Sequence, residues 1–104
     1  MSIQERIADQ VKQHPVILYM KGSAQMPLCG FSARAVSILK AYQIPFETVD
    51  VLQDDELRQG IKLFSNWPTI PQLYVNGEFI GGSDILSEMH DNNELGALFS
   101  SIQK

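Results

Sequence analysis

The chain has 104 residues, which is too short for two independent hydrophobic cores and predicts one domain over residues 1–104. Hydrophobic residues make up 44% and charged residues 19%, a composition that is typical of a folded globular protein and argues against disorder. Eight Lys and Arg stand against twelve Asp and Glu, and the basic residues form no run, so we expect no nucleic-acid partner.

Two features bear on the compartment. The longest apolar run, residues 15–20, is too short to span a membrane, and the N-terminus is too polar for a signal peptide. Cys29 is the single cysteine, so an internal disulfide is impossible and nothing favours secretion. We therefore expect a soluble cytoplasmic protein without a membrane partner, or an organellar form that has lost a transit peptide.

The N-terminal third predicts two helices around a strand. Ser2 and Glu5 have the spacing of a capping box, and apolar residues recur every four positions after them, which predicts a helix over 3–13. Residues 16–20 form an unbroken apolar run, typical of a central strand covered on both faces. A second helix is predicted over about 30–41. Its expected buried stripe is Phe31, Ala35, Val36 and Leu39.

The middle of the chain predicts a strand, a helix and a hairpin. Residues 46–51 alternate and are rich in strand formers, and Asp54 can open the helix that follows. The short segments 72–75 and 78–80 flank an Asn-Gly pair, which suits a type I′ hairpin turn. The expected buried side of the helix is Leu57, Ile61 and Phe64.

Two short helices are predicted at the C-terminus, one capped by Ser83 and running to about His90, the other capped by Asn93. The first two strands and the helix between them form a βαβ unit, which requires parallel strands, and the hairpin adds two antiparallel ones. The sequence therefore predicts an α/β fold with a four-stranded mixed sheet flanked by helices on both faces.

Cys29 is the residue that points to chemistry. It lies where a loop turns into a helix, and the N–H groups and positive dipole of a first helical turn favour the thiolate. Lys21, at the end of the first strand, can add a positive charge. Such a pair is typical of an activated nucleophile or a metal ligand. The alternative is an inert buried thiol, which the surrounding Pro and Gly residues disfavour.

The missing second thiol limits what Cys29 can do. A dithiol oxidoreductase needs a resolving cysteine, and Ser32 occupies that position, so intramolecular exchange is excluded. A mixed disulfide resolved by an external thiol and metal ligation both remain open. A 2Fe-2S cluster takes four thiolate or imidazole ligands, and His14 and His90 lack the spacing to help. Two subunits and two external thiols would complete the set, which indicates a cluster at a dimer interface.

Residues 29–32, Cys-Gly-Phe-Ser, resemble the CGFS signature of monothiol glutaredoxins. Further matches are Lys-Gly at 21–22, Trp-Pro-Thr-Ile-Pro at 67–71 and Gly-Gly-Ser-Asp at 81–84. The resemblance covers essentially the whole chain. It implies a thioredoxin-like fold, in agreement with the predicted order of elements.

The resemblance also implies roles for individual residues. Cys29 would be the catalytic thiol and would carry the cluster iron. Lys21 and Arg58 would hold the glycine carboxylate of glutathione, and the backbone of Ile70 would pair with the cysteinyl part. Pro71 would follow a cis peptide bond.

Ser83 and Asp84 would bind the γ-glutamyl end of glutathione by the same resemblance. The chemistry agrees, because a tripeptide with two carboxylates and one ammonium requires cationic groups, helix N-terminal N–H groups and one acid.

Of three functions considered, the resemblance favours the first, because the Gly-Phe-Ser context resembles that of poorly active cluster carriers. The first is a carrier that holds a glutathione-ligated 2Fe-2S cluster in a homodimer and passes it to recipient apoproteins, with a BolA-like protein as a further partner. The second is a glutathione-dependent oxidoreductase of low activity that removes glutathione from protein mixed disulfides. The third is an adaptor in which Cys29 is incidental.

Overall fold

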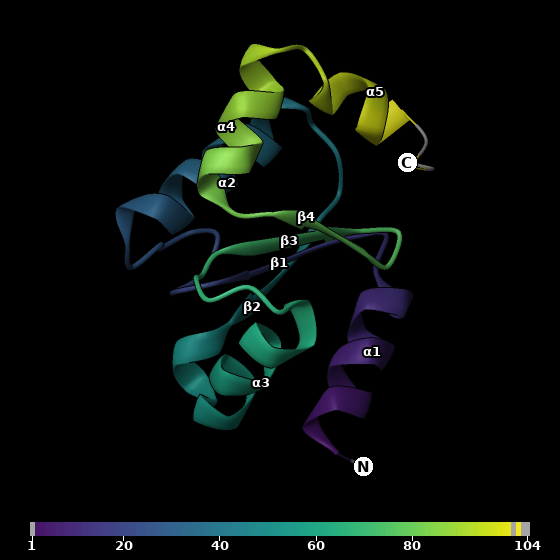
Figure 1. Ribbon diagram of the computed structural model, residues 1–104. Helices are drawn as coiled ribbons and strands as arrows, with labels where there is room; N and C mark the ends of the chain where they lie inside the picture. The colour runs from purple at the N-terminus through teal and green to yellow at the C-terminus, as the bar shows by residue number, and fades with distance from the viewer. Residues whose placement is uncertain (1, 101, 103–104) are drawn as a thin grey trace.

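The computed structural model describes residues 2–100 and 102, which form one mixed sheet with helices on both faces (Figure 1). The predicted α/β architecture is confirmed. The elements in chain order are α1 (Ile3–Gln13), β1 (Val16–Met20), α2 (Gly30–Ala41), β2 (Glu47–Asp50), the 3₁₀ helix η1 (Val51–Gln53), α3 (Asp55–Ser65), β3 (Gln72–Val75), β4 (Glu78–Gly81), α4 (Ser83–Asp91) and α5 (Leu95–Ser100).

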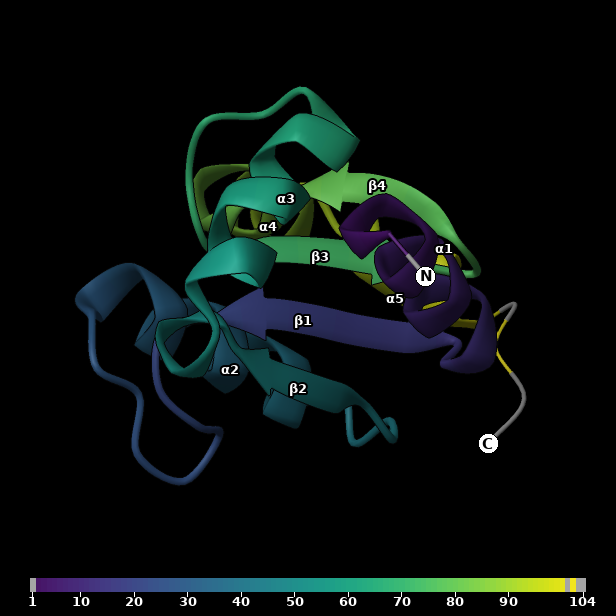
Figure 2. The same cartoon turned by 90° about the horizontal axis from the view of Figure 1, so that it is seen from below.

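The four strands lie in the order β2-β1-β3-β4, so that β1 is internal as predicted (Figure 2). β1 pairs in parallel with β2 through the crossover helix α2, and it pairs antiparallel with β3. β3 and β4 form the predicted hairpin. Asn76 and Gly77 at its turn have φ angles of 52° and 83°, the positive values that a type I′ turn requires.

Alternation along β1 divides the core between the two faces of the sheet. Val16, Leu18 and Met20 pack with residues of α2, α4 and α5, whereas Ile17 and Tyr19 pack with residues of α1 and α3. All five residues are buried, which explains why the strand lacks the polar alternation of a half-exposed sheet. Figure 1 shows the two helical layers on opposite sides of the sheet.

The predicted helix starts are confirmed at α1 and α3. The Glu5 N–H donates to the Ser2 hydroxyl at 3.2 Å, and the Ser2 N–H donates to the Glu5 carboxylate at 3.3 Å, which completes the capping box. Asp54 caps α3 by accepting the Leu57 N–H at 3.1 Å. The two helices therefore begin where the local sequence predicts.

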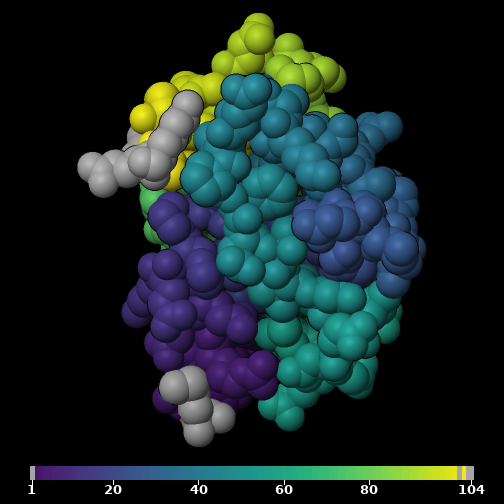
Figure 3. Space-filling model, turned by 180° about the vertical axis from the view of Figure 1, so that it is seen from behind, coloured from purple at the N-terminus to yellow at the C-terminus, as the bar shows by residue number. Residues whose placement is uncertain are grey.

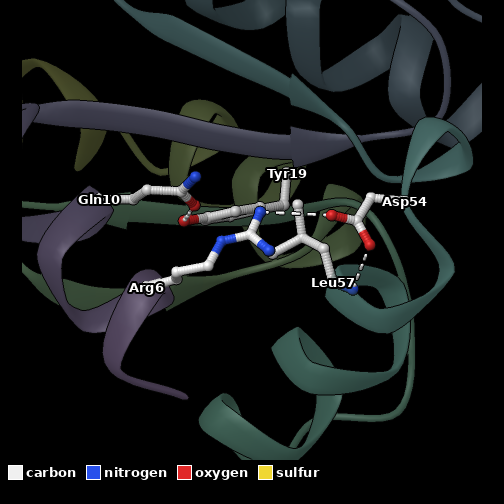
Figure 4. A network of polar contacts seen from close by, with 5 residues as sticks. All are labelled: Arg6, Gln10, Tyr19, Asp54 and Leu57. Carbon is white, nitrogen blue, oxygen red and sulfur yellow. Dashed lines mark hydrogen bonds and ion pairs between the residues drawn. The ribbon is translucent and has the colours of Figure 1, made fainter. Parts of the chain in front are cut away.

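A polar network fixes α1 against the sheet and α3 (Figure 4). Arg6 lies 3.2 Å from the Asp54 carboxylate, and the Tyr19 hydroxyl donates to the Gln10 side-chain oxygen at 2.7 Å. Burial raises the pKa of Tyr19, so this hydroxyl stays protonated and remains a donor. The network joins α1 to the central strand and to the first residue before α3.

The prediction for the buried stripe of α2 was wrong at Phe31, whose side chain is 63% exposed. The residues that face the core are Ser32, Ala35, Val36 and Leu39. Their i, i+3, i+4, i+7 spacing is that of a helical face, and Phe31 lies one residue, about 100°, away from it. A serine occupies a core position here because its hydroxyl has hydrogen-bond partners.

Two predicted caps near the C-terminus were also wrong. Gly82 is the N-cap of α4, and Ser83 is the first residue of the helix. The Ser83 side chain makes no capping hydrogen bond. Asn93 does not cap α5, because it lies two residues before the helix in a left-handed conformation with φ of 61°. The residue directly before the helix is Glu94, whose carbonyl accepts the Leu98 N–H. Phe64, expected in the buried side of α3, is half-buried and packs beside Tyr74 with ring centroids 5.9 Å apart.

Within residues 2–100 and 102, no helix is long and apolar enough to cross a membrane.

Candidate functional site

Cys29 is the N-cap residue of α2, and its side chain is partly exposed. Its sulfur accepts the Ser32 N–H at 3.3 Å and lies 3.3 Å from the Ser32 hydroxyl oxygen. That oxygen also accepts the Lys21 N–H at 3.1 Å. The fully buried Ser32 side chain thus connects the end of β1 to the sulfur.

These contacts determine how readily Cys29 ionises. Partial burial raises the pKa of the thiol, but hydrogen bonds from the Ser32 side chain, from the backbone of Ser32 and Phe31, and the positive charge of Lys21 outweigh it. The pKa of Cys29 lies below its ordinary value, in the direction that a helix start predicts. The thiolate is the reactive and metal-binding form.

The loop before Cys29 requires glycine at position 22. Gly22 has φ of +89°, and a Cβ there would lie 2.5 Å from the Met26 carbonyl oxygen and 2.7 Å from the Leu28 nitrogen. The Gly22 N–H donates to the Asp50 carboxylate at 3.0 Å, which fastens the loop to the end of β2. In the space-filling view the loop and start of α2, in blue, adjoin the teal segment of β2 and α3 (Figure 3).

A pocket of about 350 Å³ opens beside the start of α2. Four residues predicted for the site, Lys21, Ile70, Ser83 and Asp84, lie in its wall. Arg58 and Cys29 are not among the lining residues, although Phe31, two residues after Cys29, is one of them. The full lining is Lys21, Phe31, Lys62, Trp67, Pro68, Thr69, Ile70, Pro71, Gly82, Ser83, Asp84 and Ile85.

The start of α4 supplies polar groups to the pocket. The Ser83 side chain is 5% exposed, and its hydroxyl oxygen is buried without a hydrogen-bond partner among the described residues. Asp84 is exposed in the first turn of the same helix. Helix N-terminal N–H groups favour anions. The pocket therefore combines a helix N-terminus, which favours anions in general, with the carboxylate of Asp84.

The loop between α3 and β3 adjoins the start of α4, since a Cβ at Gly82 would lie 3.0 Å from the Pro71 carbonyl oxygen, and it also lines the pocket. The Ile70–Pro71 peptide bond is cis, as predicted. The Trp67 ring is 38% exposed and packs on Phe79 with ring centroids 5.8 Å apart. Thr69 is exposed, whereas Ile70 is buried. All five residues of the segment 67–71 line the pocket.

The sequence analysis missed Lys62 and misassigned Phe31, and both line the pocket. Lys62 lies on α3 four residues after Arg58, so the two cationic side chains share one helix face. This four-residue spacing is the sequence signal that could have indicated Lys62 as a second cationic residue of the site. The Nε of Arg58 is buried without a partner among the described residues.

Metal-binding groups are sparse. Within residues 2–100 and 102, no group of three or more His, Cys, Asp or Glu side chains is placed to hold a metal ion. The Nδ1 of His90, on α4, lies 2.8 Å from the hydroxyl of Tyr42, the C-cap residue of α2, so this contact joins the two helices. One chain therefore offers an iron-sulfur cluster the single thiolate of Cys29.

The Glutaredoxin family model matches residues 16–80, and the chain belongs to the glutaredoxin family as a monothiol member. It is 60% identical to an uncharacterized monothiol glutaredoxin ycf64-like from Synechocystis sp., over 86% of this chain and 84% of that protein. It is 44% identical to Glutaredoxin 4 of Pasteurella multocida, over 98% and 94% of the two chains. The solution structure of reduced poplar apo GrxS14 is similar, with a TM-score of 0.83, 44% identity and coverage of 95% and 91%. The fold is therefore the thioredoxin-like glutaredoxin fold.

Proposed function

We propose that residues 1–104 act as one glutaredoxin domain that binds glutathione in this pocket and carries a 2Fe-2S cluster between two subunits. The observation that carries the proposal is a single thiol with a lowered pKa at the start of α2, beside a pocket whose lining includes Lys21, Lys62 and Asp84. The cluster is cargo, passed on to recipient apoproteins in the cytoplasm.

The charges of the pocket suit glutathione. Lys21 and Lys62, which both line the pocket, offer positive charge to the glycine carboxylate, and Arg58 joins them through its guanidinium. The first turn of α4 receives the γ-glutamyl carboxylate, with the Ser83 hydroxyl as a donor. The Asp84 carboxylate then pairs with the γ-glutamyl ammonium.

The extended middle of the tripeptide lies along the loop before β3. The Ile70 backbone pairs with its cysteinyl residue in the manner of a peptide strand, which directs the glutathione sulfur toward Cys29. A bound glutathione thus provides a second thiolate next to the first.

The ligand count requires a second subunit. Two irons need four thiolate ligands, and one chain with one glutathione supplies two. A second copy with its own glutathione completes the set. Exposed apolar side chains on both sides of Cys29 in the sequence, Met26, Leu28 and Phe31, offer the surface on which another subunit can pack. A BolA-like protein is the proposed alternative to the second copy.

Anaerobic reconstitution with iron, sulfide and glutathione tests the carrier function. We expect a brown protein that elutes as a dimer, and a colourless monomer when glutathione is omitted or when Cys29→Ser is used. A colourless product with glutathione present, or equal cluster loading without it, contradicts the proposal.

The lowered pKa of Cys29 also favours a second function, the removal of glutathione from protein mixed disulfides. The Cys29 thiolate would attack the glutathione sulfur and release the protein thiolate. A free glutathione thiolate would then attack the Cys29–glutathione disulfide, which regenerates Cys29 and yields oxidised glutathione. Steady-state turnover of a glutathionylated protein measures this activity, and its absence from Cys29→Ser is the control.

A further inference from the structure

The side chain of Gln72, the first residue of β3, is 0% exposed and its amide has three hydrogen-bond partners. Its Nε2 donates to the Trp67 carbonyl and to the Thr69 carbonyl, both at 3.1 Å. Its Oε1 accepts the Tyr74 hydroxyl at 3.1 Å. Because only the NH₂ end of an amide can donate, the two carbonyls determine the orientation of the group.

Both carbonyls belong to the loop that walls the pocket. Residues 67–69 are exposed, and apart from the packing of Trp67 on Phe79 their side chains contribute little buried surface that could shape the loop. The Trp67 N–H is anchored to α3, where it donates to the Lys62 carbonyl at 3.1 Å. Gln72 holds the other side of the same segment through its two N–H groups.

The contact with Thr69 also orients the next residue. In a planar trans peptide the C=O and the following N–H point in opposite directions. Because the Thr69 carbonyl is turned toward the buried Gln72, the Ile70 N–H is turned away from it. Thr69 and Ile70 both line the pocket, which leaves this N–H available to a ligand.

We propose that Gln72 is a positioning residue for glutathione: its buried amide sets the Thr69–Ile70 peptide plane and the Trp67 backbone in the shape that receives the tripeptide. The inference rests on the proposed function, because glutathione is the ligand. The rival explanation is that Gln72 only stabilises the fold.

The substitution Gln72→Met tests the proposal, since it keeps a long side chain and removes both donors. We expect glutathione affinity, measured by isothermal titration calorimetry, to fall about tenfold. The loss of one hydrogen bond between the displaced Ile70 N–H and glutathione can cause a change of this size. Tyr74→Phe is the matched control, because it removes the hydroxyl that contacts Oε1 and leaves both donors in place. We expect it to lower thermal stability and to keep glutathione affinity within about twofold of the parent. A folded Gln72→Met protein with parental affinity overturns the proposal.

Trp67 gives a readout that needs no ligand, because it is the only tryptophan in the sequence. We expect acrylamide to quench its fluorescence more strongly in Gln72→Met than in the parent, and equally in Tyr74→Phe and the parent. Unchanged quenching in Gln72→Met contradicts the positioning role. Absence of glutathione binding in the parent would overturn the proposed function, whereas the quenching comparison would still test the loop.

Gln72→Glu provides a second variant of nearly the same shape. Its carboxyl can donate one hydrogen bond when protonated and none when ionised. We therefore expect its glutathione affinity, relative to that of the parent at the same pH, to recover as the pH is lowered. A constant ratio across the pH range would show that the donors do not matter.

Discussion

The Ser32 hydroxyl oxygen lies 3.3 Å from the Cys29 sulfur and 3.1 Å from the Lys21 backbone nitrogen. The Lys21 N–H donates to this oxygen, and so can the Cys29 thiol; once the thiol is ionised, the hydroxyl proton can be donated to the sulfur. Donation to a thiolate stabilises its charge. The serine at the place of a resolving cysteine therefore still acts on the sulfur, as a donor and not as a second thiol.

We predict that Ser32→Ala raises the pKa of the Cys29 thiol, because the variant loses one of the groups that lower it. Alkylation by iodoacetamide at neutral pH is expected to slow about fivefold, the equivalent of one hydrogen bond of about 1 kcal/mol. The ultraviolet absorbance of the thiolate, followed against pH, measures the shift directly.

The same prediction has a consequence for stability. The pKa of Cys29 is lowered in the folded state. The stability that this shift contributes is fully present above the unfolded pKa of about 8.5, and it is lost as the pH falls through the folded pKa. Between these two pKa values the free energy of unfolding of the parent should rise with pH, and it should rise more than that of Ser32→Ala. Ser37→Ala, on an exposed position of α2, is the control. Coincident titration curves for Ser32→Ala and the parent would refute the prediction.

Gly22→Ala is expected to destabilise the protein by about 2 kcal/mol, because an L-residue is strained at positive φ and the added Cβ meets backbone. Urea denaturation measures the free energy of unfolding. The clash atoms are the Met26 oxygen and the Leu28 nitrogen, which cannot move without displacing the loop before Cys29.

Gly96→Ala is the matched control for Gly22→Ala. Gly96 lies in α5 with open space at its Cβ position and without positive φ. Alanine there should stabilise the protein by about 0.5 kcal/mol. Similar free energies of unfolding for the two variants would disprove the requirement for glycine at position 22.

The sequence predicted the architecture well because its signals are local. The capping box at Ser2 and Glu5, the unbroken apolar run of β1 and the Asn-Gly turn each specify an element through neighbouring residues. Their order along the chain leaves few topologies, since the β1-α2-β2 crossover requires parallel strands. The CGFS motif then identified the family.

Apart from the Asn93 cap and the burial of Phe64, the errors lie at the pocket, where tertiary contacts override local preference. Phe31 is apolar and was assigned to the core, yet the core position is occupied by Ser32, whose hydroxyl is satisfied by Lys21 and Cys29. Ser83 is a good capping residue, yet its hydroxyl is buried beside the pocket and has no hydrogen-bond partner in the part of the chain that the structure describes. No single-sequence pattern reveals which hydroxyl has partners in the fold.

Lys62 lines the pocket, and the proposed function gives it one charge-assisted contact with the glycine carboxylate of glutathione, so we expect Lys62→Ala to weaken glutathione binding about fivefold. The loss should shrink as salt is added, since screening weakens the contact in the parent. Isothermal titration calorimetry at two salt concentrations measures both effects. Lys40→Ala, in the last turn of α2, changes the net charge equally and lies outside the pocket lining. Equal losses for the two variants would contradict a specific role for Lys62.

Asp54→Asn tests the network that joins α1 to α3. The Leu57 N–H and Arg6 hold the pKa of the Asp54 carboxyl below its usual range. The ionised carboxylate therefore contributes to the stability of the fold above the unfolded pKa of about 3.9, and this contribution is lost as the pH falls through the folded pKa. Asparagine keeps the cap but loses the charge. We expect the variant to be less stable than the parent at neutral pH and to converge with it in acid, as measured by urea midpoints against pH. Asp9→Asn, at an exposed position of α1, should leave the acid-dependent loss intact, and parallel curves for Asp54→Asn and the parent would refute the role of the charge.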